Sequence, residues 1–159
     1  MTGNNDAKRI RAVGILLKGD EVLLIHRKNI KEYFVFPGGG VEKGETIEQA
    51  VSRELKEETS IKISIAKLLY KHIYDDTTEQ YFYLCDYISG EPKLSDNSIE
   101  NQEMLKGNDY YQPLWVKLSE LRNLLVYPLE IRDLLLEDFK NNFSNAVRVF
   151  VIKVSELRS

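Results

Sequence analysis

Three glutamates, Glu54, Glu57 and Glu58, lie close together in one short stretch of the sequence. If this stretch is a helix, residues three and four apart share one side of it, so the carboxylates can converge on one point. Carboxylate oxygens are hard ligands that suit Mg²⁺ or Mn²⁺ better than Zn²⁺. Neither cysteines nor paired histidines accompany them, which argues against a zinc site. The stretch therefore predicts a site for a magnesium-type cation.

The helix that must carry these glutamates is predicted over residues 46–59. Thr46 followed by Gln49 fits a capping box, which places the first helical residue at about Ile47. On the helical wheel one side is apolar and should face the core. This apolar side consists of Ile47, Ala50, Val51 and Leu55.

The positions of the glutamates on this wheel conflict with simple folding rules. Glu54 and Glu58 fall within the apolar side and Glu57 lies at its margin. Burial and mutual repulsion of carboxylates oppose folding, and local rules broken in this way typically mark a functional site. A protruding helix end with solvated glutamates would explain the same pattern.

A run of glycines, Gly38-Gly39-Gly40, lies just upstream of this helix. Such a run is poor material for the interior of a helix or strand. We therefore predict a turn in which the backbone, at Gly39 in particular, approaches a ligand or metal closely.

The rest of the chain alternates many strands with one further helix, which indicates an α+β fold with a mixed sheet flanked by helices. Residues 1–7 should fray, 8–159 should form a single domain, and the polar segment 91–109 should be a surface loop. The expected strands are 10–18, 21–28, 33–36, 61–74, 80–88, 111–118 and 147–154, and the second helix is 128–140.

The composition excludes several classes of function. The 159 residues carry a net charge of −3, which gives no diffuse attraction to nucleic-acid polymers or anionic membranes, so we expect neither as a partner. No apolar run is long enough for a membrane span or a signal peptide. The single cysteine, Cys85, excludes an intrachain disulfide and favours a reducing compartment, so we expect a cytoplasmic protein.

The spacing of residues around the glutamates resembles the Nudix box of the MutT-like Nudix hydrolases. Five residues separate Gly39 from Glu45, and seven separate Glu45 from Arg53. Ser60 stands where the family pattern has its last glycine, so we expect a small loss of stability or a different helix exit, because the glycine normally ends the helix in a left-handed conformation. The remaining matches are Glu54, Leu55, Glu57, Glu58 and Ile61, and the Phe36-Pro37-Gly38-Gly39 run before the box is also similar to the family.

The resemblance implies a fold, an activity and a set of roles. It implies a Nudix-type α/β/α sandwich and a hydrolase that acts on a nucleoside diphosphate linked to another moiety, with a metal-activated water attacking a phosphorus. Arg53 would pair with Glu45 and hold the loop against the helix. Carried over by position, the Mg²⁺ or Mn²⁺ ligands would be Glu54, Glu57, Glu58 and the Gly38 carbonyl.

The sequence says less about which residues bind the substrate and which substrate they bind. Arg27 ends a predicted strand where family members often place a phosphate-binding residue, and a solvated strand end is its alternative. Thr77 stands where a proline often accompanies ADP-ribose specificity, and the extended motifs linked with NADH or coenzyme A are also missing, so nucleoside triphosphates, oxidised ones included, are the default substrates. Candidate stacking aromatics are Tyr33, Phe34, Phe36, Tyr81 and Tyr83, and candidate additional acids in the loop are Glu100, Glu103 and Asp109.

Two other functions compete with hydrolysis. A Nudix-like module that binds a nucleotide without turnover would share the fold, although such modules commonly have eroded metal ligands. A prenyl diphosphate isomerase would need a cysteine near the start of the box, where none is present. A Walker-type loop is excluded because no Gly-Lys-Ser/Thr follows the glycines.

The tail suggests a contact surface. Residues 147–152 carry bulky side chains on both faces of a predicted strand, and such a strand must be covered. It could close the domain's own sheet or add to a partner subunit's edge, and we predict a homodimer.

Overall fold

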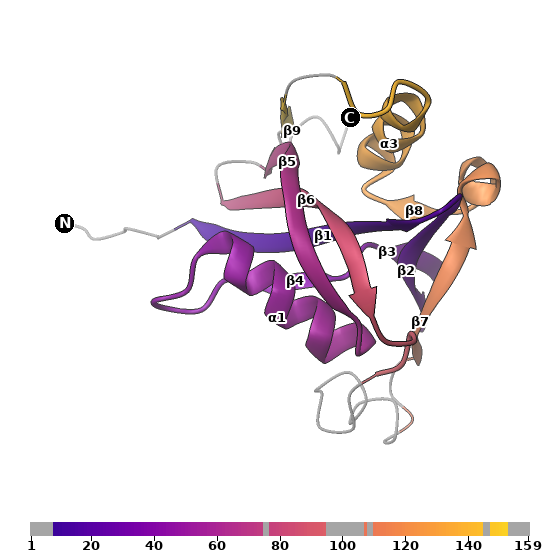
Figure 1. Cartoon of the computed structure of the whole chain (residues 1–159), viewed down its shortest axis with the longest axis horizontal. Coiled ribbons are helices and arrows are strands. Elements are labelled where there is room, and N and C mark those ends of the chain that lie inside the picture. The colour runs from indigo at the N-terminus through magenta and orange to yellow at the C-terminus, as the bar shows by residue number, and fades with distance from the viewer. Residues whose placement is uncertain (1–7, 75–76, 95–106, 108–109, 145–146, 153–159) are drawn as a thin grey trace.

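The structure, a computed structural model, describes residues 8–74, 77–94, 107, 110–144 and 147–152. Strands dominate it, and the helices lie on the outside (Figure 1). The elements in chain order are β1 (Arg9–Lys18), β2 (Glu21–Lys28), β3 (Glu32–Val35), β4 (Gly38–Gly40), α1 (Ile47–Thr59), β5 (Lys62–Tyr74), β6 (Thr78–Ser89), β7 (Tyr110–Lys117), the 3₁₀ helix η1 (Leu118–Asn123), β8 (Val126–Tyr127), α3 (Leu129–Lys140) and β9 (Arg148–Ile152).

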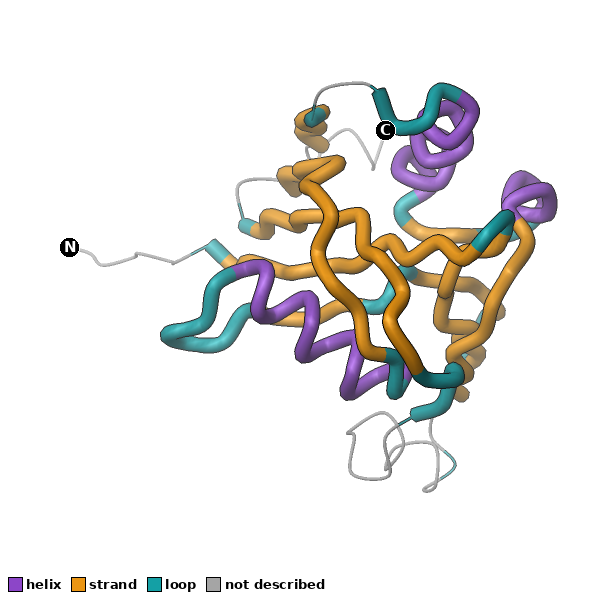
Figure 2. Tube along the Cα trace, viewed as in Figure 1, coloured by secondary structure: helices purple, strands orange, loops and turns teal. Residues whose placement is uncertain are grey.

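The strands form one mixed, curled sheet. Its order is β8-β3-β2-β1-β6-β5-β9, with β4 added beside β1 and β7 beside β2. The pairs β1–β6, β3–β8 and β5–β9 are parallel, and the other pairs are antiparallel. Helix α1 covers one side of the sheet and α3 lies on the other (Figures 1 and 2). This arrangement confirms the predicted α+β sandwich.

Strand β1 separates two apolar cores because successive side chains of a strand point to opposite faces. Ala12 and Leu16 belong to the core that α1 covers, whereas Val13 and Ile15 belong to the core that α3 covers. Between them, a Cβ on Gly14 would lie only 2.7 Å from Leu55 of α1. Helix α1 therefore packs directly on the β1 backbone, which fixes the position of its glutamates.

Both ends of α1 are set by specific hydrogen bonds. The Gln49 backbone N–H donates to the Thr46 hydroxyl at 3.0 Å, and the predicted capping box is present. At the other end Ser60 adopts the left-handed conformation, with φ 66°, and its hydroxyl donates to the Lys93 carbonyl at 2.5 Å. The helix thus ends on a left-handed residue that carries a side chain, the conformation that the sequence analysis expected of a glycine.

The prediction of a turn at the glycine run was wrong, because Gly38–Gly40 is itself the short strand β4. Strand β4 pairs antiparallel with β1, while Gly38 N–H and the Gly40 carbonyl bond Glu58 and Arg53 of α1. Side chains are excluded there for steric reasons: a Cβ on Gly38 would lie 2.8 Å from the Val13 Cα, and one on Gly39 would collide with the Glu54 carboxylate. The glycines permit close packing rather than a turn.

Three further observations complete the comparison with the sequence. The elements η1 and β8 were not predicted. Strand β9 pairs with β5 and so extends the chain's own sheet, leaving Val147 and Val149 about half exposed. None of the described helices has the length and apolar character needed to cross a membrane.

Candidate active site

Helix α1 brings two of its three glutamates into the protein. Glu58 is only 8% exposed and the Glu54 side chain 14% exposed, whereas the Glu57 side chain is 52% exposed. The helical wheel predicted this gradient. A solvated helix end therefore accounts for Glu57 alone, and the burial of the other two carboxylates needs specific partners.

Arg53 connects the helix, the preceding loop and strand β4. Its Nε and Nη2 bond the two carboxylate oxygens of Glu45 at 2.7 and 2.9 Å, a bidentate geometry that is among the stronger ion pairs. Its Nη1 donates to Glu54 Oε1 at 2.9 Å, and Nη2 also donates to the Gly40 carbonyl at 2.9 Å. The predicted Arg53–Glu45 pair is present, and the contact with Glu54 shows that it also orients a candidate metal ligand.

The same hydrogen bonds shift two pKa values. The Arg53 guanidinium, helped by the Glu42 backbone N–H, lowers the pKa of Glu45 to about 2. Conversely, the Glu45 carboxylate raises the pKa of Arg53 above its already high ordinary value. Both groups are thus charged at any physiological pH, and the link between loop and helix does not titrate there.

Strand β4 directs its backbone toward α1. In an antiparallel pair, residues alternate between positions bonded to the partner strand and positions that face away from it. Bonds from Gly14 N–H to the Pro37 carbonyl and from Val41 N–H to the Ile10 carbonyl leave Gly38 and Gly40 facing away from β1. Accordingly, Gly38 N–H donates to Glu58 Oε1 at 3.2 Å. The Gly38 carbonyl lies on this same outer edge.

The oxygen donors at this edge fit a hard divalent cation. Carboxylates and a backbone carbonyl, without sulfur or imidazole, are the set that Mg²⁺ and Mn²⁺ prefer. The absence of a Cβ at Gly39 leaves the space in which the Glu54 carboxylate sits. Within the described ranges, however, no three acidic, histidine or cysteine side chains stand close enough to share one ion. Arg53 holds Glu54, the Gly38 backbone holds Glu58, and Glu57 points outward. The predicted convergence of all three carboxylates is not present in this conformation.

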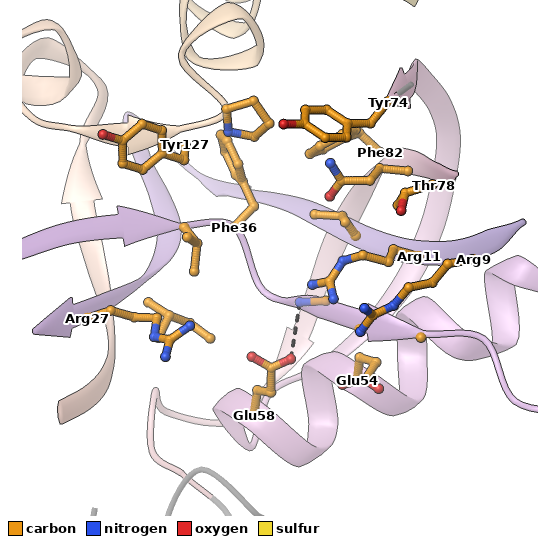
Figure 3. Close-up of a pocket in the computed structure, with 18 of the residues that line it drawn as sticks. Arg9, Arg11, Arg27, Phe36, Glu54, Glu58, Tyr74, Thr78, Phe82 and Tyr127 are labelled. Atoms are coloured by element: carbon orange, nitrogen blue, oxygen red, sulfur yellow. Dashed lines mark hydrogen bonds between the residues drawn. The ribbon is translucent and has the colours of Figure 1, made fainter. Parts of the chain in front are cut away.

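A pocket of about 710 Å³ opens beside these carboxylates. Glu54 and Glu58 lie on one side of it (Figure 3), and the glycines of β4 also line it. Aromatic rings and three arginines supply much of the rest: Phe36, Tyr74, Phe82, Tyr111 and Tyr127, with Arg9, Arg11 and Arg27.

The three predicted substrate residues, Arg27, Phe36 and Gly39, all line this pocket. The Arg27 guanidinium lies 4.2 Å from the centre of the Tyr111 ring and donates to the Tyr111 hydroxyl at 2.5 Å. Phe36 is 5% exposed and packs edge-on against Phe82 at 6.1 Å, so it is mainly a core residue that lends one edge to the pocket wall.

Other sequence candidates have different surroundings. Tyr83 is buried in the core below α1, and Phe34 stacks on His26 at 4.6 Å. The sequence analysis missed Arg9, Arg11, Tyr111 and Tyr127 as pocket residues. Alternation of Arg9 and Arg11 along the first strand was the one available signal, because it places both on one face. The candidate acids Glu100, Glu103 and Asp109 lie outside the described residues.

Comparisons with known proteins identify the family and the fold. The family model described as NUDIX domain matches residues 8–135. An ADP-ribose pyrophosphatase of Methanocaldococcus jannaschii is 40% identical over 94 residues, which are 55% of this chain and 56% of that protein, so this chain spans little more than half of it. An 8-oxo-dGTP diphosphatase of Escherichia coli is 38% identical over 88 residues, covering 51% of this chain and 68% of that protein. A solved NUDIX hydrolase from Nitrosomonas europaea has a TM-score of 0.74 at 16% identity, over 94% of this chain and 81% of that chain, which shows a shared fold.

Proposed function

Because the chain belongs to the NUDIX domain family, we propose that it is a divalent-metal-dependent hydrolase of a nucleoside diphosphate linked to another moiety. The observation that carries the proposal is the pair of buried carboxylates, Glu54 and Glu58, held against a side-chain-free strand at the wall of an arginine-lined pocket. Burial of carboxylates costs stability, and a pyrophosphate substrate with its cation explains why the chain bears that cost.

The residues have distinct proposed roles. Glu54, Glu57, Glu58 and the Gly38 carbonyl would hold Mg²⁺ or Mn²⁺, with Glu57 turning in from its exposed position. Such an ion, once bound, supplies charge for the pyrophosphate and acidifies a bound water.

The residues around these ligands position them and receive the substrate. Arg53 fixes Glu54, and Glu45 fixes Arg53. Arg27 would bind a substrate phosphate, while the edge of Phe36 and the backbone of Gly39 would border the substrate.

We propose nucleoside triphosphates, oxidised ones included, as the substrates to test first. The arginines of the pocket support a polyphosphate, and one relative is an 8-oxo-dGTP diphosphatase. Another relative is an ADP-ribose pyrophosphatase, so the panel includes ADP-ribose, dinucleoside polyphosphates and nucleotide sugars. The assay follows, by chromatography and with Mg²⁺ present, the nucleoside monophosphate that cleavage of the pyrophosphate forms. Turnover that Glu54→Gln abolishes supports the proposal.

The second candidate function is a nucleotide-binding sensor. It is favoured because the carboxylates of Glu54, Glu57 and Glu58 do not converge on one point in this conformation. It would bind one panel member tightly, by calorimetry, without turning any over at millimolar Mg²⁺ or Mn²⁺. That result would replace the hydrolase proposal.

We propose a cytoplasmic location, because the one cysteine is free and buried and a chain without an intrachain disulfide suits a reducing compartment. We also propose that residues 8–159 act as one domain and form a homodimer, with the half-exposed Val147 and Val149 in the contact. Sedimentation showing a monomer at tens of micromolar would refute the dimer.

A further inference from the structure

We propose that Arg9 and Arg11 form a second anion-binding subsite, which holds a dianionic phosphate that the substrate carries beyond its scissile pyrophosphate. The inference rests on the proposed function, because it concerns the substrate of the same pocket. The candidate metal ligands do not determine whether the substrate carries this additional phosphate group, whereas the proposed subsite does.

The two arginines share one face of β1 because they are two residues apart in a strand. Their partners in the parallel strand β6 are Thr78 for Arg9 and Gln80 for Arg11. All four residues line the pocket. Two neighbouring strands therefore present cationic and hydrogen-bonding groups side by side on the surface that faces the substrate.

Strand β4 leaves the approach to these arginines open. Arg11 is paired with Gly40 across the β1–β4 ladder, where a residue with a side chain would stand directly beside it. A Cβ built on Gly40 meets nothing within 4 Å. The space beside Arg11 is thus unfilled, and a ligand can cross the glycine strand from the carboxylates to the guanidinium groups.

The charges of Arg9 and Arg11 are not neutralised by the described part of the protein. Arg53, Arg132 and Arg148 each bond a carboxylate there. By contrast, neither Arg9 nor Arg11 forms a hydrogen bond or ion pair through its side chain with any described residue. Two like charges on one strand face repel each other. A phosphate, whose oxygens match the guanidinium fork, would relieve this repulsion.

The position of the pair indicates which part of the substrate it contacts. Figure 3 shows Arg27 at one end of the pocket and Arg9 and Arg11 at the other, with Glu58 between them. A pyrophosphate bound at the carboxylates with one end on Arg27 therefore extends its other end toward Arg9 and Arg11. That end must be anionic, which favours a third phosphate in the chain or a phosphate monoester on the distal moiety over a neutral sugar.

The test uses Arg9→Gln, Arg11→Gln and the double variant of the full chain. Arg122→Gln is the matched control, since it removes the same charge from an exposed residue of η1 that lies outside this pocket. Binding of inorganic tripolyphosphate is measured by calorimetry with and without Mg²⁺. Each single variant should weaken binding about tenfold and the double variant more, as expected for charge-assisted bonds, whereas Arg122→Gln should bind like the wild type.

Kinetics with two matched substrate pairs distinguish the sources of the phosphate. If a third phosphate of the chain is bound, the variants raise KM for ATP about tenfold relative to ADP, with little change in kcat. If a phosphate monoester is bound, they raise KM for NADP⁺ relative to NAD⁺. Equal KM changes within both pairs, or tripolyphosphate binding unchanged in the double variant, overturn the subsite while leaving hydrolysis intact. Absence of turnover with any substrate, while tripolyphosphate binding still falls in the variants, overturns the hydrolase and leaves the subsite standing.

Discussion

Replacing Gly39 with alanine tests whether the glycine strand exists to place the Glu54 carboxylate. The new Cβ would lie 2.5 Å from Glu54 Cδ and 2.7 Å from its Oε2. Ordinary contacts between carbon atoms begin at about 3.5 Å, so the carboxylate must withdraw by roughly 1 Å. A displacement of that size exceeds the roughly 0.2 Å tolerance of a metal–ligand distance. It also breaks the 2.9 Å bond from Arg53 Nη1.

The fold itself should survive this change. Losing the charge-assisted bond to Glu54 costs about 1–2 kcal/mol, and replacing glycine by alanine in extended backbone returns about 0.4–1 kcal/mol. The net loss of about 1 kcal/mol lowers Tm by about 2–4 °C for a chain of this size. The Mg²⁺ concentration for half-maximal activity should rise at least about tenfold, as metal sites lose 10–100-fold in affinity when ligand support is removed.

Gly40→Ala is the matched control for metal binding, because a Cβ there meets nothing within 4 Å. Since Gly40 also borders the approach to Arg11, both variants are compared by the Mg²⁺-dependent increase in Tm, which needs no substrate, and Gly39→Ala alone by Mg²⁺ titration of activity. We expect Gly40→Ala to keep the wild-type Mg²⁺ response and Gly39→Ala to lose most of it. If Gly39→Ala retained the wild-type Mg²⁺ midpoint and thermal shift, Glu54 would not be a metal ligand and the reasoning from the glycine strand would be refuted.

Three more predictions follow from the burial and pKa values of individual groups. Glu57→Gln should lower kcat by orders of magnitude, because it removes a proposed metal ligand. It should leave the metal-free Tm unchanged or higher, because Glu57 is half exposed and its contact with Arg53 is 3.4 Å long. Near-normal turnover would refute the role of Glu57. Since Arg53 lowers the pKa of Glu45 to about 2 from 4.5, the pair stabilises the fold above pH 4.5 and this contribution is lost as pH falls through 2. The Tm difference between wild type and Glu45→Gln should be constant from pH 5 to 8 and shrink below pH 4.5, and a change between pH 5 and 8 would contradict this. Burial lowers the pKa of His72 below 6.5, and the Glu130 carboxylate opposes this shift in part. The stability of the fold should therefore fall as pH drops below 6.5, because the unfolded chain then binds a proton that the folded chain does not. Calorimetry between pH 7 and 5 should show a smaller fall in stability for His72→Asn than for the wild type.

The helix and its glutamates were predictable because their signals are local. Capping by Thr46, the apolar side and the burial of Glu54 and Glu58 all follow from residues within a few turns of one helix. The pairing of Arg53 with Glu45 was expected only from the family resemblance, because a contact between a loop residue and a helix residue leaves no periodic pattern in the sequence. The structure added that the same guanidinium also holds Glu54.

The glycine strand and the pocket were not predictable because they depend on strand pairing across the sequence. Glycine has a low strand preference, so only the partner strand makes Gly38–Gly40 a strand. Likewise, Arg11 and Gln80 become neighbours only through the parallel β1–β6 pairing, which joins residues that no sequence window contains. The sequence marks the candidate metal ligands, whereas the sheet register decides which groups stand opposite them. The candidate substrate contacts of this protein are therefore a property of β-pairing, and the same strand β1 that carries Arg11 also supports the glutamates, because α1 packs on its backbone at Gly14.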